Sequence, residues 1–273
     1  MKIGIIGQGF VGNAVYQKFK QYFNISTYDL DKSKSNSSEE VTMSQDVVFV
    51  CLPTPMDEVG RCDTSLVEST IKKISLIGKC KTVVIKSTVS PGTSSRLNGI
   101  FNNIDIVFNP EFLTERNAVT DYENQNRIIL GGPRPSTTKL KRIFSKVFPS
   151  AHIIKTDSTH AEMVKYLTNT FLSVKVSFAN EIYQLCEKLN IDYDKVVEYA
   201  THDARLGDSH WNVPGHDGDF GFGGHCFPKD LSAVIHLTRE LNTINNVLFA
   251  TQKTNDKVRQ DRDWEGMKGR AVT

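Results

Sequence analysis

The sequence predicts an α/β fold in which a doubly wound parallel sheet with helices on both faces is followed by an all-helical central domain. Short apolar runs alternate with amphipathic segments through the first half of the chain. This alternation stops near Asp157, and apolar residues then recur at helical spacing to about Leu189. We therefore expect a sheet domain at residues 1–157, a helical domain at 158–260 and a separate tail at 261–273.

Six strand-like runs account for the predicted sheet. They are Lys2–Ile6, Ile25–Tyr28, Asp46–Leu52, Thr82–Lys86, Asp105–Phe108 and Arg127–Leu130. Ligands of doubly wound sheets bind at the carboxyl ends of the strands. The residues that follow these runs, among them Pro53, Thr54, Thr88 and Glu111, are therefore the first candidates for a site.

A glycine motif follows the first run and predicts a Rossmann-type dinucleotide site. Gly7, Gly9 and Gly12, with Phe10 and Val11 between them, permit a tight turn and the close approach of a pyrophosphate to a helix N-terminus. A glycine-rich turn without a ligand is the alternative.

Acidic and basic residues after the second run bear on the choice of cofactor. Asp29 ends that run, where its carboxylate can bind a ribose diol and repel a 2′-phosphate, so NAD is predicted rather than NADP. Lys34 could reach a ribose or phosphate from the polar stretch 31–40, which is predicted to be a solvated loop.

The second half opens with Thr159-His-Ala-Glu162, which matches a capping box and predicts a long helix to about Leu189. Further helices are expected at Tyr193–Ala200, Pro228–Leu241 and Thr243–Arg259. The apolar pattern of the long helix is wider than one packed face requires, which predicts a homodimer through the helical domain.

Lys165 and Asn169 are four residues apart on the long helix and share a face. A solvated face and a functional pair are both consistent with that spacing. In the functional alternative, a partly buried Lys165 ammonium would need an anionic partner.

The segment Gly221–Asp230 predicts a nucleophile. Cys226 stands between a glycine-rich loop and a helix expected to begin at Pro228, where the helix dipole and Lys229 lower a thiol pKa. Asp230 lies within reach of the same pocket. The other four cysteines differ: Cys51 and Cys186 fall in apolar patterns typical of core thiols, whereas Cys62 and Cys80 carry no signal.

Composition limits the partners. The net charge is +2 with 39% apolar and 23% charged residues, which predicts no nucleic-acid and no membrane partner. The five cysteines show no metal-ligand spacing, so no metal is expected. Their odd number, together with an N-terminus unlike a signal peptide, predicts a cytoplasmic protein.

Several short pieces form an ordered series along the chain: Gly-Gln-Gly-Phe-Val-Gly at 7–12, Pro-Thr-Pro at 53–55, Lys-Ser-Thr-Val-Ser-Pro-Gly-Thr at 86–93, Asn-Pro-Glu-Phe-Leu at 109–113, Glu115, Asn117-Ala118, Arg127 to Gly131, Glu162, Lys165, Asn169, Asn180-Glu181, Arg205-Leu-Gly207 and Gly221–Asp230. In this order they resemble the UDP-glucose/GDP-mannose dehydrogenases, a family of NAD-dependent enzymes. The last piece is the most diagnostic.

The resemblance implies a four-electron oxidation of a nucleotide sugar, most like UDP-glucose to UDP-glucuronate, through a thiohemiacetal and thioester on Cys226. It implies oxyanion stabilisation by Lys165 and Asn169. It also implies that Asp230 and Thr88 activate the attacking water and that Glu115 acts as a general acid and base. The implied cofactor contacts are Gly7, Gly9, Phe10, Val11, Gly12, Asp29, Lys34, Pro53, Thr54, Thr88, Glu115 and Lys229. The implied substrate contacts are Glu111, Phe112, Leu113, Glu115, Lys165, Asn169, Arg205, Trp211, Asn212, Gly215 and Gly223.

The tail departs from the family pattern. Family members carry a second nucleotide-binding domain, and residues 261–273 resemble only the linker and first strand residues of that domain. Three alternatives therefore stay open beside UDP-glucose oxidation: GDP-mannose or another nucleotide sugar as substrate, a truncated NAD-binding dimeric homologue without turnover, and a two-electron hydroxyacid dehydrogenase. The last would need no cysteine.

Overall fold

The computed structural model describes residues 1–273 as two compact units. Unit 1 comprises Met1–Thr54 and Asp63–Lys165, and unit 2 comprises Pro55–Cys62 and Tyr166–Thr273. The division differs from the one expected from sequence in three ways. It falls inside the long helix rather than before it, the segment Pro55–Cys62 belongs with the helices, and the tail is part of unit 2.

Unit 1 contains a seven-stranded sheet in the order β2-β1-β3-β4-β5-β6-β7. The strands are β1 (Lys2–Ile6), β2 (Asn24–Tyr28), β3 (Val47–Val50), β4 (Thr82–Ile85), β5 (Asp105–Phe108), β6 (Arg127–Gly131) and β7 (His152–Thr156). The expected α/β class is confirmed, but the sheet is not wholly parallel, because β5 and β6 pair antiparallel through Phe108 and Gly131. Strand β7 was not predicted. The strand order reverses between β1 and β3, which is where such sheets bind ligands.

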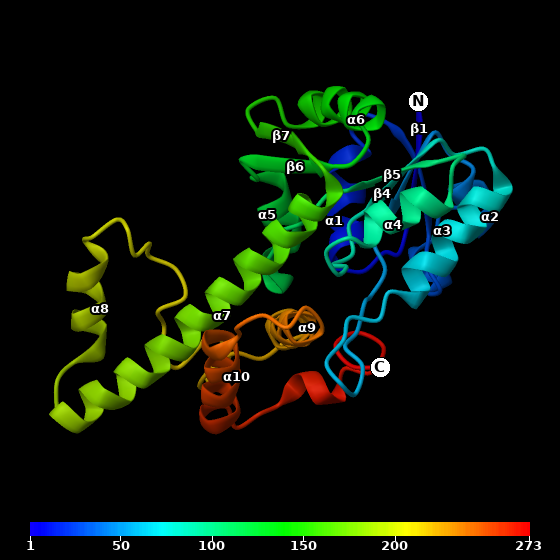
Figure 1. The fold of residues 1–273 in the computed structure, drawn as a ribbon. Helices are drawn as coiled ribbons and strands as arrows, with labels where there is room; N and C mark the ends of the chain where they lie inside the picture. The colour runs from blue at the N-terminus through cyan, green and yellow to red at the C-terminus, as the bar shows by residue number, and fades with distance from the viewer. The chain divides into compact units, whose positions relative to one another are not determined.

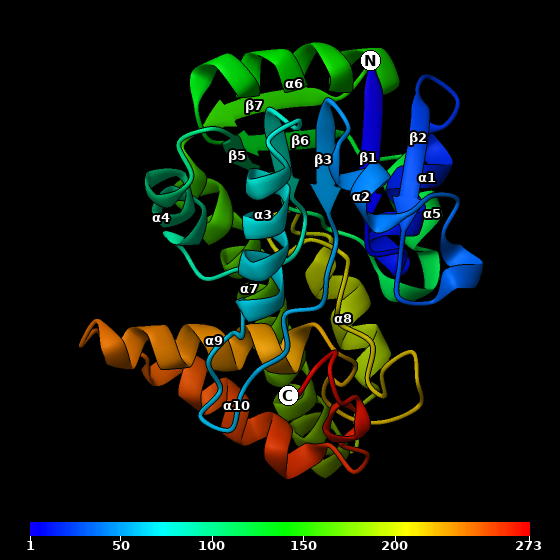
Figure 2. The same cartoon turned by 90° about the vertical axis from the view of Figure 1, so that its right-hand side faces the viewer.

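Helices cover both faces of the sheet (Figures 1 and 2). Helices α1 (Phe10–Phe19), α5 (Ala118–Glu123) and α6 (Arg134–Val147) pack on one face. Helices α2 (Glu39–Met43), α3 (Ser65–Ile77) and α4 (Thr93–Ile100) pack on the other. Successive strand residues point to opposite faces, so Phe49 enters the first core while Val48 and Val50 enter the second. Short 3₁₀ turns lie at Lys32–Lys34 and Glu115–Asn117.

The predicted capping box of the long helix α7 (Ser158–Leu189) is wrong. The helix begins one residue earlier, and Asp157 accepts a hydrogen bond from the backbone amide of His160 at 3.0 Å. Glu162 instead accepts from the backbone amides of Gly92 and Ser94, at 2.6 and 2.8 Å. Its buried carboxylate therefore caps the N-terminus of helix α4, where donor groups lack partners within the helix.

Unit 2 is built from the remainder of α7 with α8 (Tyr193–Thr201), α9 (Phe227–Glu240) and α10 (Asn246–Val258). These helices lie within three residues of their predicted bounds at each end. A 3₁₀ turn at Asp263–Gly266 lies within the tail. The tail is tied to the inserted segment by two backbone hydrogen bonds, Met56 N to Ala271 O at 2.8 Å and Thr273 N to Met56 O at 3.0 Å.

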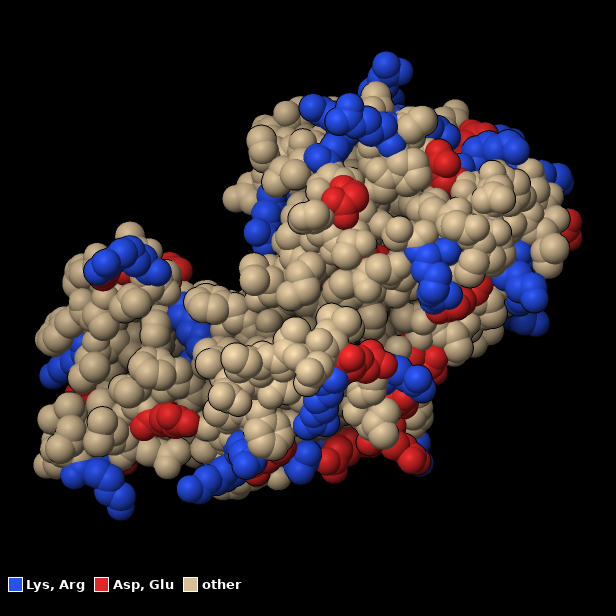
Figure 3. Space-filling model, in the orientation of Figure 1, with Lys and Arg blue, Asp and Glu red and all other residues tan.

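Charged side chains of both signs are interspersed on the face drawn in Figure 3. None of the helices combines the length and the apolar character that crossing a bilayer demands.

Candidate active site

The glycine loop after β1 has the geometry of a pyrophosphate cradle. A Cβ at Gly12 would lie 1.8 Å from the carbonyl oxygen of Gly7, so a side chain there would separate α1 from β1. Gly7 has φ +88°, which favours glycine. A Cβ at Gly9, the N-cap of α1, would meet nothing within 4 Å, and no side chain caps that helix end. The loop thus leaves open space at the N-terminus of α1, which fits a dinucleotide phosphate.

Asp29 lies at the carboxyl end of β2 and is tied to this loop. Its Oδ2 accepts the backbone amide of Gln8 at 2.6 Å, and its Oδ1 accepts the amide of Asp31 at 2.9 Å. The carboxylate is therefore fixed beside the glycines, as a ribose-binding acid requires. Lys34 is exposed and pairs with Asp31 at 3.4 Å.

The loops after β3 and β4 are joined to each other. Thr54 is buried, and its hydroxyl donates to the carbonyl oxygen of Thr88 at 2.7 Å. Thr88 is buried as well, whereas Pro53 is exposed. Together with the glycine loop, these residues place candidate cofactor contacts at the carboxyl ends of three neighbouring strands, β1, β3 and β4.

The anionic partner that a buried Lys165 requires is Glu111. The Lys165 ammonium donates to Glu111 Oε1 at 2.8 Å and to the Glu111 carbonyl at 2.7 Å. Both side chains are nearly inaccessible, at 4% and 9% exposure. Burial raises the pKa of Glu111, but the Lys165 charge and hydrogen bond outweigh burial and hold that pKa below its usual range. The face that carries Lys165 is therefore not solvated.

Sequence reasoning did not assign a role to Lys86, which shares this cluster. Its ammonium donates to the side chain of Asn109 at 3.0 Å and approaches the carbonyl of Pro110 at 3.4 Å. Burial lowers the pKa of Lys86 to about 8, although nearby negative groups oppose the shift. Lys86 and Lys165 thus hold the turn 109–111 through two adjacent carbonyls, those of Pro110 and Glu111.

The rest of the 111–115 turn is less buried. Phe112 and Leu113 are half-buried, and the amide of Leu113 donates to Glu111 Oε2 at 2.8 Å. The Arg127 guanidinium lies 4.0 Å from the centre of the Phe112 ring. Glu115 is exposed.

Unit 2 contains a second buried cluster at the start of α9. Asp230 Oδ1 accepts from the Lys229 ammonium at 2.5 Å, and Asp230 Oδ2 accepts from the Asn169 side-chain amide at 2.6 Å. Cys226 is the half-buried N-cap of α9. Burial lowers the pKa of Lys229, but the charges of Asp230, Cys62 and Cys226 raise it more, so its ammonium stays protonated. A thiol at a helix N-terminus beside a fixed cation has the setting of a nucleophile.

The 202–226 loop supplies the remaining candidates. Arg205 is exposed, and its guanidinium forms a salt bridge with the carboxylate of Asp203 at 2.5 Å. Trp211 is half-buried, its indole donates to the carbonyl of Gly207 at 2.8 Å, and the Lys175 ammonium lies 4.6 Å from its ring centre. Asn212 is exposed, Gly215 is half-buried, and Gly223 packs against the segment that follows α10.

All five cysteines are thiols in the structure. Cys62 and Cys80, which carry no sequence signal, are both buried, and burial raises the pKa of Cys80 to about 11. Burial likewise raises the pKa of Cys51 to about 12. The structure contains no group of three or more His, Cys, Asp or Glu side chains that could hold a metal ion.

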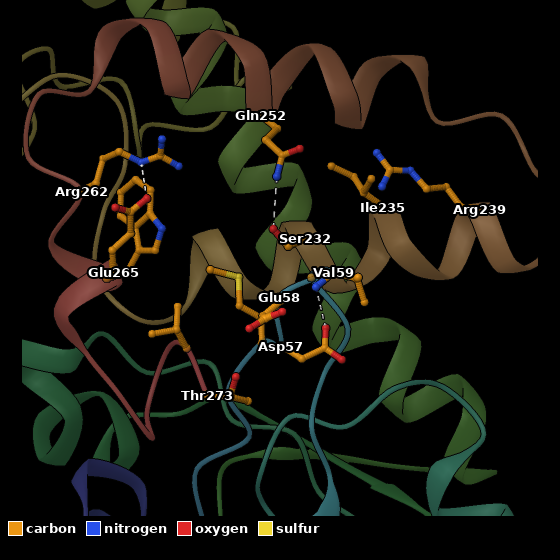
Figure 4. A pocket seen from close by; sticks show the side chains of 14 residues that line it. Asp57, Glu58, Val59, Ser232, Ile235, Arg239, Gln252, Arg262, Glu265 and Thr273 are labelled. Atoms are coloured by element: carbon orange, nitrogen blue, oxygen red, sulfur yellow. Dashed lines mark hydrogen bonds and ion pairs between the residues drawn. The ribbon is translucent and has the colours of Figure 1, made fainter.

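A cavity of about 460 Å³ lies between the inserted segment, α9, α10 and the tail of unit 2 (Figure 4). None of the candidate residues above lines it. Its polar groups are partly paired among themselves, as in the hydrogen bond from Gln252 to Ser232 and the ion pair of Arg262 with Glu265 at 2.9 Å.

A doubly wound sheet with an open glycine loop after β1 has the architecture of a dinucleotide-binding domain. Residues 24–149 match the NAD-binding domain of the UDP-glucose/GDP-mannose dehydrogenase family, and residues 159–257 match its central domain. The chain belongs to this family.

Individual relatives agree with this assignment. UDP-glucose 6-dehydrogenase TuaD of Bacillus subtilis is 29% identical over 94% of this chain and 63% of its own length. UDP-glucose 6-dehydrogenase of Rickettsia bellii is 32% identical over 87% of this chain and 55% of its own. A solved UDP-glucose dehydrogenase from Pyrobaculum islandicum matches with a TM-score of 0.85 and 26% identity, over 94% of this chain and 68% of that one. The chain thus spans only part of the curated relatives' length.

Proposed function

We propose that this protein oxidises a nucleotide sugar with NAD, converting a primary alcohol to a carboxylate through a covalent intermediate on Cys226. The observation that carries the proposal is the pairing of a fixed cation, Lys229, with a thiol at the N-terminus of α9. A simple two-electron alcohol dehydrogenase would not need that thiol.

NAD, when bound, accepts hydride from the sugar. In the proposed sequence, loss of hydride and a proton turns the alcohol into an aldehyde, and the Cys226 thiolate adds to the aldehyde carbon. Loss of a second hydride leaves a thioester on Cys226. Water then attacks the thioester carbon, the C–S bond breaks, and the carboxylate leaves while the thiol is restored.

The buried polar groups suit the charge changes of these steps. Lys165 and Asn169 lie one turn apart on α7, and we assign them to the developing alkoxide. Asp230, held by Lys229 and Asn169, is assigned to the attacking water together with Thr88. Glu115 is assigned to proton transfer.

Replacement of Cys226 tests the proposal. Cys226→Ala should abolish formation of the acid while NAD still binds, because the glycine loop lies in unit 1. Cys226→Ser should release acid far more slowly, since a hydroxyl is a weaker nucleophile and an ester hydrolyses less readily than a thioester. Cys186→Ala, at a buried thiol of unit 2, is the matched control and should cost stability alone. Acid formation by Cys226→Ala at the parent rate would refute the covalent route.

For the substrate we propose UDP-glucose, because the curated relatives reported above carry that name. GDP-mannose and other nucleotide sugars are the competing substrates. The alternative function is that of an NAD-binding dimeric homologue without turnover. Counting NADH formed per sugar separates these functions: two for the four-electron enzyme, one for a two-electron dehydrogenase and none for the homologue. The thiol chemistry needs a reducing compartment, for which we propose the cytoplasm.

We also propose a homodimer through α7. A row of large apolar side chains along this helix is 41% to 64% exposed: Met163, Leu167, Phe171, Phe178, Leu185 and Leu189. Exposed apolar rows of this kind are typical of interfaces. Phe171→Glu should therefore increase the monomer fraction in sedimentation, whereas Lys195→Glu on α8 should not. A parent protein that is monomeric at micromolar concentration would contradict this proposal.

A further inference from the structure

A buried arginine lies directly behind the glycine-rich loop that leads to Cys226. Arg259 follows α10 and is only 7% exposed. Its guanidinium faces three carboxylates: Nη1 lies 2.7 Å from Asp217, Nε 3.4 Å from Asp219 and Nη2 3.6 Å from Asp263. The guanidinium is held by its Nε, which donates to the carbonyl oxygen of Asp261 at 2.7 Å, so that its charge faces the three carboxylates.

Asp263 connects this arginine to the loop backbone. Both of its carboxylate oxygens accept the amide of Gly224, at 3.0 and 3.1 Å. The neighbouring Gly223 lies so close that a Cβ there would be 2.3 Å from Arg259 Nη2 and 2.4 Å from Asp263 Oδ1. The loop backbone at Gly223 and Gly224 therefore packs against the Arg259–Asp263 ion pair, two residues before Cys226.

Asn255 and Asn180 hold the other side of the same loop. Asn255 Oδ1 accepts the amide of Phe222 at 2.7 Å, and Asn255 Nδ2 donates to the Phe222 carbonyl at 3.0 Å. Asn180 Oδ1 accepts the amide of Gly221 at 3.1 Å. Side chains thus accept the backbone amides of three of the four residues from Gly221 to Gly224, and together these contacts form a clamp on the loop.

We propose that Arg259 and Asp263 are positioning residues that set the reactivity of the Cys226 thiol through the 221–224 loop. The inference rests on the proposed function for its catalytic meaning, and it adds residues that lie beyond the matched central domain, which ends at 257. A thiol draws its reactivity from its place at a helix N-terminus, and displacement of about 1 Å can cost catalysis about a hundredfold. The clamp keeps Cys226 in that place.

Alkylation of Cys226 by iodoacetamide tests the proposal independently of turnover. The rate is followed by peptide mass spectrometry across the range in which a thiol titrates, about pH 6 to 10. Asp263→Ala should raise the pH midpoint and slow alkylation at neutral pH about twofold to fivefold, the effect expected from a weakened helix-terminus interaction. Asp263→Asn keeps an oxygen for Gly224 and should fall between Asp263→Ala and the parent.

Asp261→Asn is the matched control, because its side chain is exposed and belongs to the same segment. It should alkylate as the parent does. In turnover, Asp263→Ala should lower kcat while the KM for NAD stays unchanged.

The outcomes separate the two proposals. If Asp263→Ala and Asp263→Asn lower only the melting temperature and leave the alkylation midpoint at the parent value, the residues are merely structural and the inference is overturned. If the midpoint shifts but the unmodified protein oxidises no nucleotide sugar, the clamp stands and the proposed function fails.

Discussion

Replacing Lys165 with methionine should strongly destabilise unit 1. The substitution removes two short hydrogen bonds and leaves the Glu111 carboxylate buried without its main counter-charge. Breaking a buried ion pair by removing one partner costs about 3–5 kcal/mol. Domains of ordinary stability unfold with about 5–15 kcal/mol, so much of the margin should be lost.

A double-mutant cycle isolates the pair from other effects of the substitution. Glu111→Gln keeps an acceptor for the Leu113 amide but leaves the Lys165 ammonium buried without its counter-charge, so it should likewise cost about 3–5 kcal/mol. The double variant Glu111→Gln/Lys165→Met should cost less than the sum, with a coupling energy of about 2 kcal/mol, because no buried charge is left alone. Urea unfolding at neutral pH measures each free energy. A coupling energy below about 0.5 kcal/mol would refute the reasoning.

The pH dependence has a definite sign. The folded-state pKa of Glu111 is depressed, so its contribution to stability is present above the unfolded value of about 4.3 and is lost as pH falls through the folded pKa. The stability difference between the parent and Lys165→Met should therefore be largest near neutral pH and shrink in acid. An equal difference in stability near neutral pH and in acid would contradict an electrostatic origin.

Three further outcomes follow from unit 1. Asp29→Asn should weaken NAD binding and relax discrimination against NADP, measured as the two dissociation constants; equal use of both cofactors by the parent would count against this. The pKa of Lys86 is about 8 in the folded state, below its unfolded value of about 10.4, so burying the charged ammonium destabilises the fold fully below pH 8. Between pH 8 and about 10.4 the free energy of unfolding of the parent should rise relative to Lys86→Met, by up to about 3 kcal/mol in urea titrations. Gly12→Ala should abolish NAD binding in calorimetry, because its Cβ would collide with the Gly7 carbonyl; Gly99→Ala, where a Cβ meets nothing within 4 Å, should not.

Much of the fold could be predicted because each element obeys a local rule. Alternating apolar runs located six of the seven strands, and helical spacing located α7 to α10. Strand β7 was missed because His152–Thr156 is largely exposed and contains only two adjacent apolar residues. The antiparallel step at β6 was missed because strand direction depends on the connection, which apolar patterning does not encode.

The misassigned capping box shows where local rules fail. The spacing of Thr159 and Glu162 fits a box, yet the carboxylate caps helix α4, which lies far away in sequence. The same limit applies to the candidate site. Sequence spacing paired Lys165 with Asn169, but only the folded chain brings Lys165 to Glu111 and Asn169 to Asp230. Lys86 and Arg259 were missed because their roles arise from burial and long-range contacts.

The segment Pro55–Cys62 interrupts unit 1 and belongs to unit 2, which has a consequence for the order of folding. Met56 obtains its backbone partners from Ala271 and Thr273, so these groups find them only after more than 200 further residues have been synthesised. Closing the loop between Met56 and Ala271 costs more chain entropy than forming any local contact in unit 2. In a fragment covering residues 1–165, the segment Pro55–Cys62 would lack its backbone partners at Ala271 and Thr273. Unit 2 should therefore be completed late in folding, when the segment Pro55–Cys62 pairs with the segment that ends at Thr273.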